Sequence, residues 1–262
     1  MTASGPSVWL VVLGIATGFV AGAVSGAFGV GGAILTTPAT QVVLGQPPLV
    51  AVGTPLPAVL PTALSGMQAY RRAGQLDFRA VRWAALPGAA GAAAGAALTG
   101  VIDAHILLLA TAALIAWQAI RVGRGAGARD PDQPEARPSR GALAATGVVA
   151  GLASGLLGIG GGVVLVPVMT GVLHMPLKRV LGTSLVIIAV MVVPGTIVHA
   201  ALGHINWAVC LWLSIGSIPG AIVGSRWTVR VKERTLRLAV AVLLSAVSIA
   251  YGAFEIHALV AG

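Results

Sequence analysis

Two glycine-rich strings are the part of this sequence best suited to bind a ligand. The first reads Ser25-Gly26-Ala27-Phe28-Gly29-Val30-Gly31-Gly32, and the second reads Ser154-Gly155-Leu156-Leu157-Gly158-Ile159-Gly160-Gly161-Gly162. Glycine allows the backbone to turn sharply and to approach a ligand closely. A helix that begins after such a turn presents unpaired N–H groups and the positive end of its dipole, which suits an anion. The strings therefore predict an anion site, with tight helix packing as the alternative.

Hydroxyl side chains accompany both strings. Ser25 and Ser154 begin the strings, and Thr54 and the pair Thr183 and Ser184 follow them further along the chain. Thr54 precedes a proline, which is typical of an N-cap followed by the first residue of a helix. Each of these hydroxyls could cap a helix or could donate a hydrogen bond to a bound anion, and the sequence leaves both roles open.

The composition places these residues in a membrane protein. The chain has 262 residues, 57% hydrophobic and 9% charged, with a mean hydropathy of +0.95, whereas soluble domains carry about 25% charged residues. The net charge of +9 comes from Lys and Arg in short loops between apolar runs, a pattern that orients membrane proteins and does not indicate nucleic-acid binding. Residues 1–27 lack Lys and Arg, so we interpret them as a first membrane segment and not as a signal peptide.

The ionisable residues narrow the chemistry further. His199 lies well inside an apolar stretch, where it could carry a proton. Cation carriers usually place an acid within the membrane, but here every acid falls in a loop or near a segment end: Asp77, Asp103, Asp130, Asp132, Glu135, Glu233 and Glu255. The sequence shows no plausible Ser/His/Asp triad, zinc-ligand spacing or P-loop, and Cys210 is its single cysteine. We therefore expect an anionic substrate, no cofactor, no metal and no enzymatic activity.

The sequence repeats itself at an offset of 129 residues. Residues 16–38 and 145–167 share twelve identical positions of 23 without a gap, where a composition of this kind gives roughly one chance match in ten. We therefore predict two halves, residues 1–121 and 141–262, joined by a hydrophilic cytoplasmic linker at 122–140.

Each half contains five apolar segments, which predicts an all-α membrane protein with about ten transmembrane segments. They cover roughly 7–27, 31–45, 49–70, 80–99 and 104–121, then 141–157, 161–173, 179–200, 207–225 and 236–256. One crossing needs about 20 apolar residues, and the second segment of each half is shorter and contains a proline. Paired interrupted segments mark the binding site of many secondary transporters. Whether these two segments cross fully or re-enter is left open.

The basic residues favour two inverted halves. If the linker is cytoplasmic and each half crosses five times, all 16 Lys and Arg residues lie in the cytoplasm. If the short second segments do not cross, the split becomes nine against seven. The positive-inside rule therefore predicts ten crossings with both termini outside. Inverted repeats are typical of secondary transporters.

Other glycines have the spacing of helix-packing stripes. They recur every four residues at Gly14, Gly18, Gly22 and Gly26, at Gly147, Gly151 and Gly155, and at Gly216, Gly220 and Gly224. Small residues at this spacing let helices approach closely in lipid, so we interpret these ten glycines as structural.

With these motifs the chain resembles the sulfite exporter TauE/SafE family of bacterial membrane permeases. The resemblance covers essentially the whole chain. It rests on the duplicated Gly-x-Gly-Gly strings, the Gly-Thr-Pro/Ser-Leu after each, and a Gly-x-hydrophobic-Asp/Asn-aromatic element at Gly74–Phe78 and Gly203–Trp207. It implies transport of sulfur-containing anions: sulfite, sulfoacetate or other organosulfonates, or thiosulfate. Carried over position by position, it implies substrate contacts from Ser25, Gly29, Gly31, Gly32, Thr54, Ser154, Gly158, Gly160, Gly161 and Thr183, to which we add the neighbouring Ser184.

The sequence therefore predicts a secondary transporter that moves such an anion across the bacterial inner membrane by alternating access. Its expected partners are the anion and membrane lipid, with no nucleic acid. The halves differ at Thr36 against Leu165 and at Tyr70 against His199, so the two half-sites need not contribute equally. An anion channel with a fixed pore and a non-transporting membrane scaffold are the alternatives.

Overall fold

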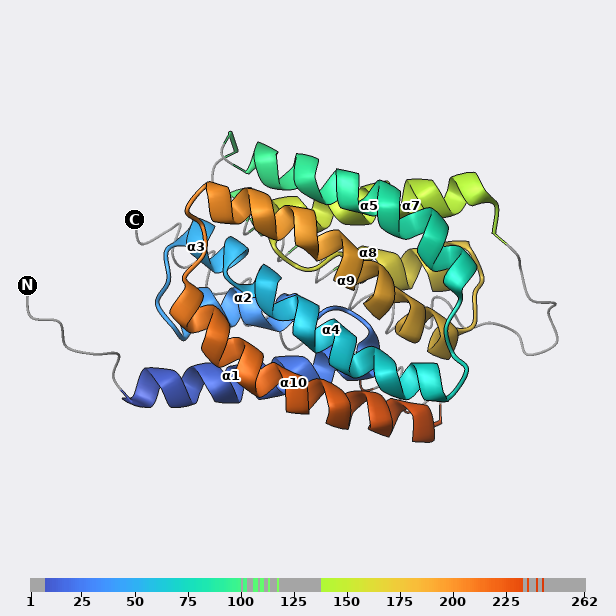
Figure 1. The fold of residues 1–262 in the computed structure, drawn as a ribbon, viewed down its shortest axis with the longest axis horizontal. Coiled ribbons are helices and arrows are strands. Elements are labelled where there is room, and N and C mark those ends of the chain that lie inside the picture. Colours follow the sequence, from blue (N-terminus) through green and yellow to red (C-terminus); the bar gives the residue numbers. More distant parts are fainter. Residues whose placement is uncertain are drawn as a thin grey trace, which may run out of the picture.

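The computed structural model describes residues 8–99 and 138–232, together with residues 101, 102, 106, 107, 109, 110, 113, 117, 235, 239 and 242. Its elements (Figure 1) are α1 (Val8–Phe28), α2 (Ala33–Val42), α3 (Pro48–Gly53), α4 (Pro55–Arg72), α5 (Phe78–Leu98), α7 (Arg140–Leu157), α8 (Gly162–Pro167), the π-helix η1 (Val168–Val172), α9 (Leu177–Ala201) and α10 (Trp207–Arg230). The described part contains helices and no strand, which confirms the predicted all-α class.

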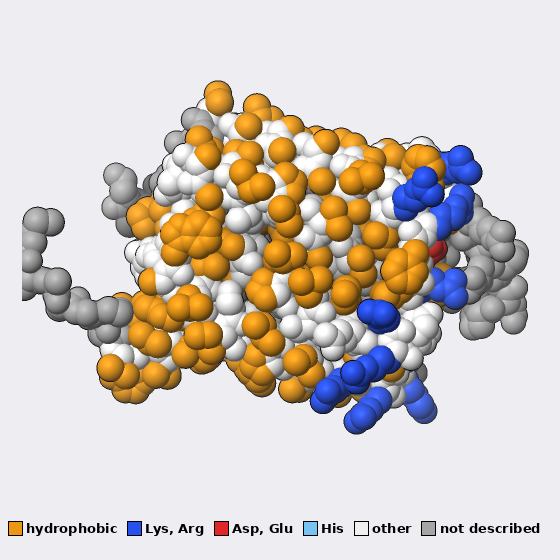
Figure 2. All heavy atoms as spheres, in the orientation of Figure 1, with side chains coloured by type: hydrophobic (Ala, Val, Ile, Leu, Met, Phe, Trp, Pro, Cys, Tyr) orange, Lys and Arg blue, Asp and Glu red, His pale blue; other side chains and the backbone are white. Residues whose placement is uncertain are grey.

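Five stretches are long and apolar enough to cross a membrane: Val8–Phe28, Pro48–Arg72, Arg140–Leu157, Leu177–Ala201 and Trp207–Arg230. Hydrophobic side chains cover most of the visible face between the two ends of the molecule (Figure 2). The protein is therefore a multi-pass membrane protein. Residues 104–121 and 236–256, predicted as the fifth segment of each half, lie mostly outside the described residues, as does the linker through residue 137. The count of ten crossings stays a prediction.

The second segment of each half is as short as the sequence indicates. α2 has 10 residues, which makes it about 15 Å long, or about half of the hydrocarbon core. α8 and η1 together cover only Gly162–Val172. A proline lies inside each segment, Pro38 in α2 and Pro167 at the change from α to π geometry, where the missing N–H disturbs the helix. Each segment is therefore shorter than the hydrocarbon core is thick, as the sequence predicts.

Two pairs of helices pack so closely that only glycine fits between them. α1 lies against α10, and α5 lies against α7. A Cβ added at Gly18 would overlap the backbone oxygen of Leu213, and one added at Gly151 would overlap that of Gly88. The interpretation of the glycine stripes as packing surfaces is confirmed. Each pair joins one helix from the first half of the chain to one from the second.

α4 and α9 form the centre of the bundle. α4 contacts α10 and α9, and α9 in turn contacts α5, so the order across the bundle is α1–α10, α4, α9, α5–α7. Figure 1 shows α4 and α9 running in opposite directions. Large side chains from both helices are fully buried here, among them Leu56, Tyr70, Leu181, Leu185 and Ile187. These helices form the apolar core against which the glycine-rich turns pack.

Lys and Arg side chains gather at one end of the molecule, on the face shown in Figure 2. We call this the basic end. The described basic residues lie near the last turns of α4 and α10 and the first turns of α5, α7 and α9: Arg71, Arg72, Arg79, Arg82, Arg140, Lys178, Arg179, Arg226, Arg230 and Lys232. This one-sided distribution is the one that the sequence predicts. The orientation of the basic end toward the cytoplasm stays a prediction.

Two hydrogen bonds, related by the 129-residue offset, tie the halves together. The Thr54 hydroxyl accepts from the backbone N–H of Asn206, and the Thr183 hydroxyl accepts from the backbone N–H of Asp77, both at 2.9 Å. The side chains of Asp77 and Asn206 are themselves the N-caps of α5 and α10. We call these two contacts the threonine latches. The Gly-x-hydrophobic-Asp/Asn-aromatic element of each half is thus a capped turn, fastened to the opposite half.

Candidate functional site

Both glycine strings form sharp turns that end a long helix and begin a short one. We call residues 29–32 the first joint and residues 158–161 the second joint. The three glycines of the first joint have φ values of +64°, +87° and +73°, and those of the second have +64°, +75° and +73°. Residues with a Cβ rarely adopt this region. The six glycines predicted for the site therefore share a conformation that favours glycine, in the same order in both halves.

The middle glycines of the two joints face each other. A Cβ on Gly31 would lie 3.5 Å from the carbonyl oxygen of Gly160 and 3.3 Å from the side chain of Ile188. A Cβ on Gly160 would lie 3.8 Å from the Cα of Gly31. Ile188 lies near the middle of α9, so the joints meet deep in the bundle. The structure thus brings together two predicted site residues that are far apart in the sequence.

The first glycine of each joint has a packing role, and its contact with substrate stays a prediction. A Cβ on Gly29 would lie 2.6 Å from the carbonyl oxygen of Leu181, and one on Gly158 would overlap the carbonyl oxygen of Val52. Such contacts are too close for any side chain. At Gly29 and Gly158 the packing alternative therefore explains the residue.

Ser25 and Ser154 carry buried hydroxyls that have no hydrogen-bond partner among the described residues. Their side chains are 0% and 1% exposed. A Cβ on Gly32 would lie 3.6 Å from the Ser25 hydroxyl, and one on Gly161 would lie 3.4 Å from the Cβ of Ser154. An unsatisfied buried polar group costs about 1–3 kcal/mol, so each hydroxyl indicates a place for a ligand or a water. These two serines are the predicted site residues that the geometry supports best.

The first joint opens onto the uncapped start of α2 and a small cavity. Gly32 is the N-cap residue and has no side chain to cap α2, while its carbonyl oxygen accepts from the backbone N–H groups of Leu35 and Thr36. The cavity has a volume of about 10 Å³, close to that of one water. Its lining consists of Ala21, Gly22, Gly31, Gly32, Thr36, Pro55, Ala58, Val59, Thr62, Leu213 and Ser217. The first joint therefore combines a helix start that has no side-chain cap with neutral hydroxyls.

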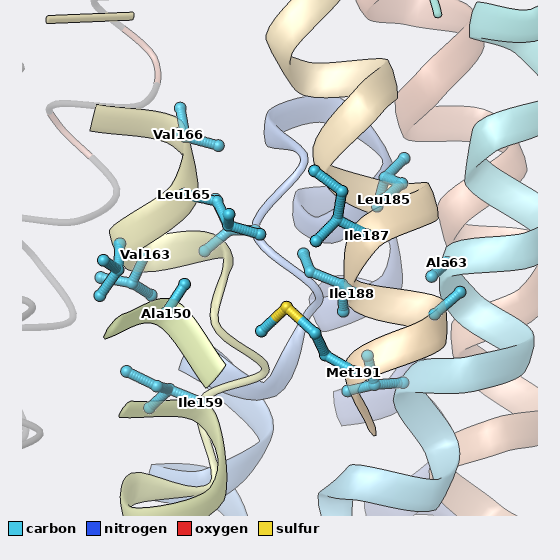
Figure 3. Close-up of a cluster of buried hydrophobic side chains, with 14 of the residues drawn as sticks. Ala63, Ala150, Ile159, Val163, Leu165, Val166, Leu185, Ile187, Ile188 and Met191 are labelled. Carbon is cyan, nitrogen blue, oxygen red and sulfur yellow. The ribbon is translucent and has the colours of Figure 1, made fainter. Parts of the chain in front are cut away.

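Apolar side chains fill the same positions around the second joint. At the 129-residue offset, Thr36 corresponds to Leu165 and Thr62 to Met191, and both replacements are fully buried. Figure 3 shows Leu165, Ile188 and Met191 directed toward the same space between α8 and α9. A Cβ on Gly161 would lie 2.7 Å from the methyl carbon of Met191. The two joints share a backbone shape but have different surroundings.

The hydroxyls that follow the strings join the halves. Thr54 has helical backbone angles and caps no helix with its side chain, and Thr183 lies inside α9. Thr54 stands at the N-cap position of α4 with Pro55 as the first helical residue, as the sequence predicts, but neither threonine hydroxyl caps a helix, because each accepts a latch hydrogen bond. The Ser184 hydroxyl lies 2.7 Å from the carbonyl oxygen of Gly29, to which it donates. A contact of these three residues with substrate stays a prediction.

His199 and Tyr70, which are equivalent in the repeat, both bind the last turn of a preceding helix. The Tyr70 hydroxyl donates to the Gly26 carbonyl oxygen at 2.9 Å, and His199 Nε2 lies 2.9 Å from the Gly155 carbonyl oxygen. Because a carbonyl only accepts, we assign the proton to Nε2. His199 Nδ1 then faces Nδ1 of His204 at 3.2 Å. The role of His199 as a proton carrier stays a prediction.

Sequence reasoning missed two polar residues of the cavity, Thr62 and Ser217. The Thr62 hydroxyl is hydrogen-bonded to the carbonyl oxygen of Ala58 at 2.6 Å and also contacts the Ser217 hydroxyl. The two side chains come from α4 and α10, 155 residues apart, so no local spacing could reveal the pair. When the halves are aligned, Thr62 lies opposite Met191, and this contrast is a signal that could have indicated the polar pair.

The comparison with known families agrees with this architecture. The model of the family described as "Sulfite exporter TauE/SafE" matches residues 14–251, a range that includes both joints and both latches. The chain belongs to the sulfite exporter TauE/SafE family. The resemblance inferred from the sequence is confirmed, and the protein is a member of a membrane transporter family.

Relatives of this TauE/SafE protein carry consistent names. A "Probable membrane transporter protein" of Xylella fastidiosa (strain 9a5c) is 29% identical over 218 residues, which cover 82% of this chain and 84% of the relative. "Probable membrane transporter protein YjnA" of Bacillus subtilis (strain 168) is 28% identical over 247 residues, covering 88% and 95%. "Probable membrane transporter protein YunE" of the same strain is 26% identical over 258 residues, covering 90% and 93%. No solved structure matches the chain significantly.

Proposed function

We propose that this TauE/SafE-family protein carries a small sulfur-containing anion, such as sulfite, sulfoacetate or another organosulfonate, or thiosulfate, across the bacterial inner membrane by alternating access. The anion binds at the first joint. The observation that carries the proposal is the buried Ser25 hydroxyl, which has no described partner and lies beside the start of α2, where no side chain of the N-cap residue occupies the helix end.

The donors at the first joint are neutral, and this supports an anion that must be released again. Residues 1–70 contain no Lys, Arg, Asp or Glu. N–H and O–H groups fixed in a medium of low dielectric constant attract an anion without an ion pair. The positive end of the α2 dipole lies at the joint and repels a cation. The same groups therefore favour binding of an anion and allow its release.

The size of the cavity implies that the site opens and closes. A volume of about 10 Å³ is too small for a sulfite ion, because it is close to that of a single water. We take this conformation as a closed one. α1–α10 and α5–α7 are the tightly packed pairs, so the units that move are these mixed pairs and not the two halves of the chain. Their relative rotation would separate Gly31 from Gly160 and widen the site.

Flux measurements in proteoliposomes test the proposal. We expect saturable uptake of one or more anions from a panel of sulfite, sulfoacetate, thiosulfate, sulfate and lactate. Unlabelled substrate inside the vesicles should accelerate this uptake, because exchange avoids the slow return of the empty carrier. Flux that internal substrate does not accelerate would indicate a channel. Absence of flux for every anion of the panel would indicate a non-transporting membrane scaffold.

A pair of variants tests whether the substrate binds at the first joint. Ser25→Ala removes the unpartnered hydroxyl and should raise the substrate Kd about tenfold. Thr196→Val is the matched control, because the Thr196 hydroxyl is also buried without a described partner but lies on α9 outside both joints. Equal substrate affinity in the two variants would show that the Ser25 hydroxyl does not contact the substrate.

A further inference from the structure

A groove at the basic end is separate from the joints. It lies between the last turns of α4 and α10 and has a volume of about 370 Å³. Its nine described lining residues are Ser65, Gln68, Ala69, Arg72, Ile222, Ser225, Arg226, Val229 and Arg230. Three of these are arginines and none is acidic. In Figure 2 basic side chains cluster where α4 and α10 end in Figure 1.

The equivalent positions of the other half show that the repeat does not require polar residues here. At the 129-residue offset the three arginines correspond to Ala201, Ala97 and Val101. The remaining positions correspond to Pro194, Ile197, Val198, Ala93, Ala96 and Gly100. The hydroxyls of Ser65 and Ser225 donate to carbonyl oxygens of their own helices, and the positive-inside tendency explains arginines at a cytoplasmic end, but neither explains Gln68 or the absence of an acid from the described lining. The α4–α10 groove therefore has the composition of a binding site for an anion.

The groove continues into apolar surface on the side away from its arginines. On α4, Leu64 is 42% exposed and lies one turn before Gln68, which in turn lies one turn before Arg72. On α10, Ile218 is 37% exposed and begins a similar row through Ile222 to Arg226. Residues four apart lie on one face of a helix. Each wall thus changes from apolar to cationic toward the basic end.

We propose that the α4–α10 groove binds an anionic phospholipid, with its phosphate headgroup among Arg72, Arg226 and Arg230 and its acyl chains along the exposed apolar rows. Guanidinium groups form paired hydrogen bonds with phosphate oxygens, and basic pockets between membrane helices recognise such headgroups. A free inorganic anion would use only the arginines. The apolar rows give the lipid its advantage, so the site is specific for an amphiphile.

Lipid binding to the purified full-length protein tests this proposal. Native mass spectrometry in detergent measures binding of dioleoyl phosphatidylglycerol, with dioleoyl phosphatidylcholine as the zwitterionic comparison. We expect tighter binding of phosphatidylglycerol. The variant Arg72→Gln, Arg226→Gln, Arg230→Gln should weaken it at least about tenfold, because each cation near the surface contributes to attraction of an anionic lipid.

The matched control is Arg71→Gln, Arg79→Gln, Lys232→Gln, which removes the same charge from exposed positions at the same end. It should change the affinity by less than about twofold, because charge outside the groove acts only through screened long-range attraction. Equal weakening by both variants would overturn the proposal in favour of diffuse electrostatics. If the groove variant does not fold, Arg226→Gln alone should still weaken phosphatidylglycerol binding by more than the control does, and an unchanged affinity would overturn the proposal.

Inorganic phosphate and sulfite provide the second arm of the experiment. The melting temperature in detergent should increase when phosphatidylglycerol is added. It should stay nearly unchanged when either free anion is added at the same concentration. An equal rise with phosphate would show a free-anion site and would overturn the assignment to lipid. These measurements do not depend on transport, so a failure of this proposal can be distinguished from a failure of the proposed function.

Discussion

The first and second joints have nearly the same backbone and very different neighbours. Their middle glycines have φ values of +87° and +75°, and their last glycines both have +73°. Thr36 and Thr62 lie beside the first joint, whereas Leu165 and Met191 fill the same positions beside the second. The comparison shows that the shape of a joint and its ability to bind a polar ligand are separable properties. The glycines determine the shape, and side chains from neighbouring helices determine the chemistry.

The second joint has a different role from the first. It meets the first joint at Gly31 and Gly160, and its apolar neighbours hold it against the middle of α9. A densely packed wall transmits displacement better than a hydrated one. We infer that the second joint is a firm surface against which the first joint closes, and the variants below examine this division of roles.

The largest expected effect comes from adding a side chain at the contact between the joints. Gly31→Val and Gly160→Val should each abolish transport while the protein still folds, because the residues have positive φ but no backbone atom closer than 3.5 Å to the added Cβ. Substrate binding and melting in detergent should be measured together. Gly18→Val is the control, and we expect it to lose folded protein because its Cβ overlaps Leu213. A Gly31→Val protein that melts early but binds substrate normally would show that the joint only serves packing.

A smaller effect should separate the polar joint from the apolar one. Thr62→Val keeps the side-chain shape and removes the hydroxyl that faces the cavity, so the substrate Kd should rise about tenfold, as for the loss of one hydrogen bond in a buried site. Met191→Leu, at the equivalent position in the second half, should change the Kd by less than about twofold. The reverse order of effects would place the substrate at the second joint.

Local sequence features were sufficient to predict the joints and the packing stripes. Glycines such as Gly31 and Gly160 occur where positive φ is needed, and stripes such as that of Gly18 occur where helices touch. Both are properties of a residue and its immediate chain neighbours, and the repeat shows them twice. Hydropathy likewise predicted the short α2, because length and proline content can be read directly.

The latches and the cavity could not be predicted in the same way. The Thr54 hydroxyl meets the Asn206 backbone across 152 residues of sequence, and the Thr62 hydroxyl meets Ser217 across 155. Which hydroxyl faces which helix depends on how α4 lies between α9 and α10, and no local pattern specifies that. A threonine before a proline therefore suggested an N-cap, although the tertiary structure gives Thr54 a different partner.

The threonine latches should behave alike in the two halves, unlike the joints. Thr54→Val and Thr183→Val each remove the acceptor of a partly buried backbone N–H, so each should cost about 1 kcal/mol of stability, a decrease of roughly 2–4 °C in Tm. The double variant should show the sum, because the latches share no residue. Melting in detergent checks stability, and substrate affinity measured on the same proteins tests the predicted substrate contact. A loss of affinity without a loss of stability would show that these threonines contact the substrate, and an unchanged affinity would limit them to the latches.

The smallest effect concerns the last turns of α4 and α9, which lie at opposite ends of the bundle and contain Tyr70 in the first half and His199 in the second. Burial lowers the pKa of His204, the ring partner of His199, below the value of about 6.5 expected in the unfolded chain. Between the lowered pKa and about 6.5 the unfolded chain binds more protons than the folded protein, so stability is complete above that range and decreases as the pH falls through it. Melting temperatures measured from pH 8 to pH 5 should therefore decrease, and His204→Gln should reduce the decrease because its side chain does not titrate. An identical pH dependence in the variant would show that other groups cause the decrease and that His204 does not distinguish the two halves in this respect.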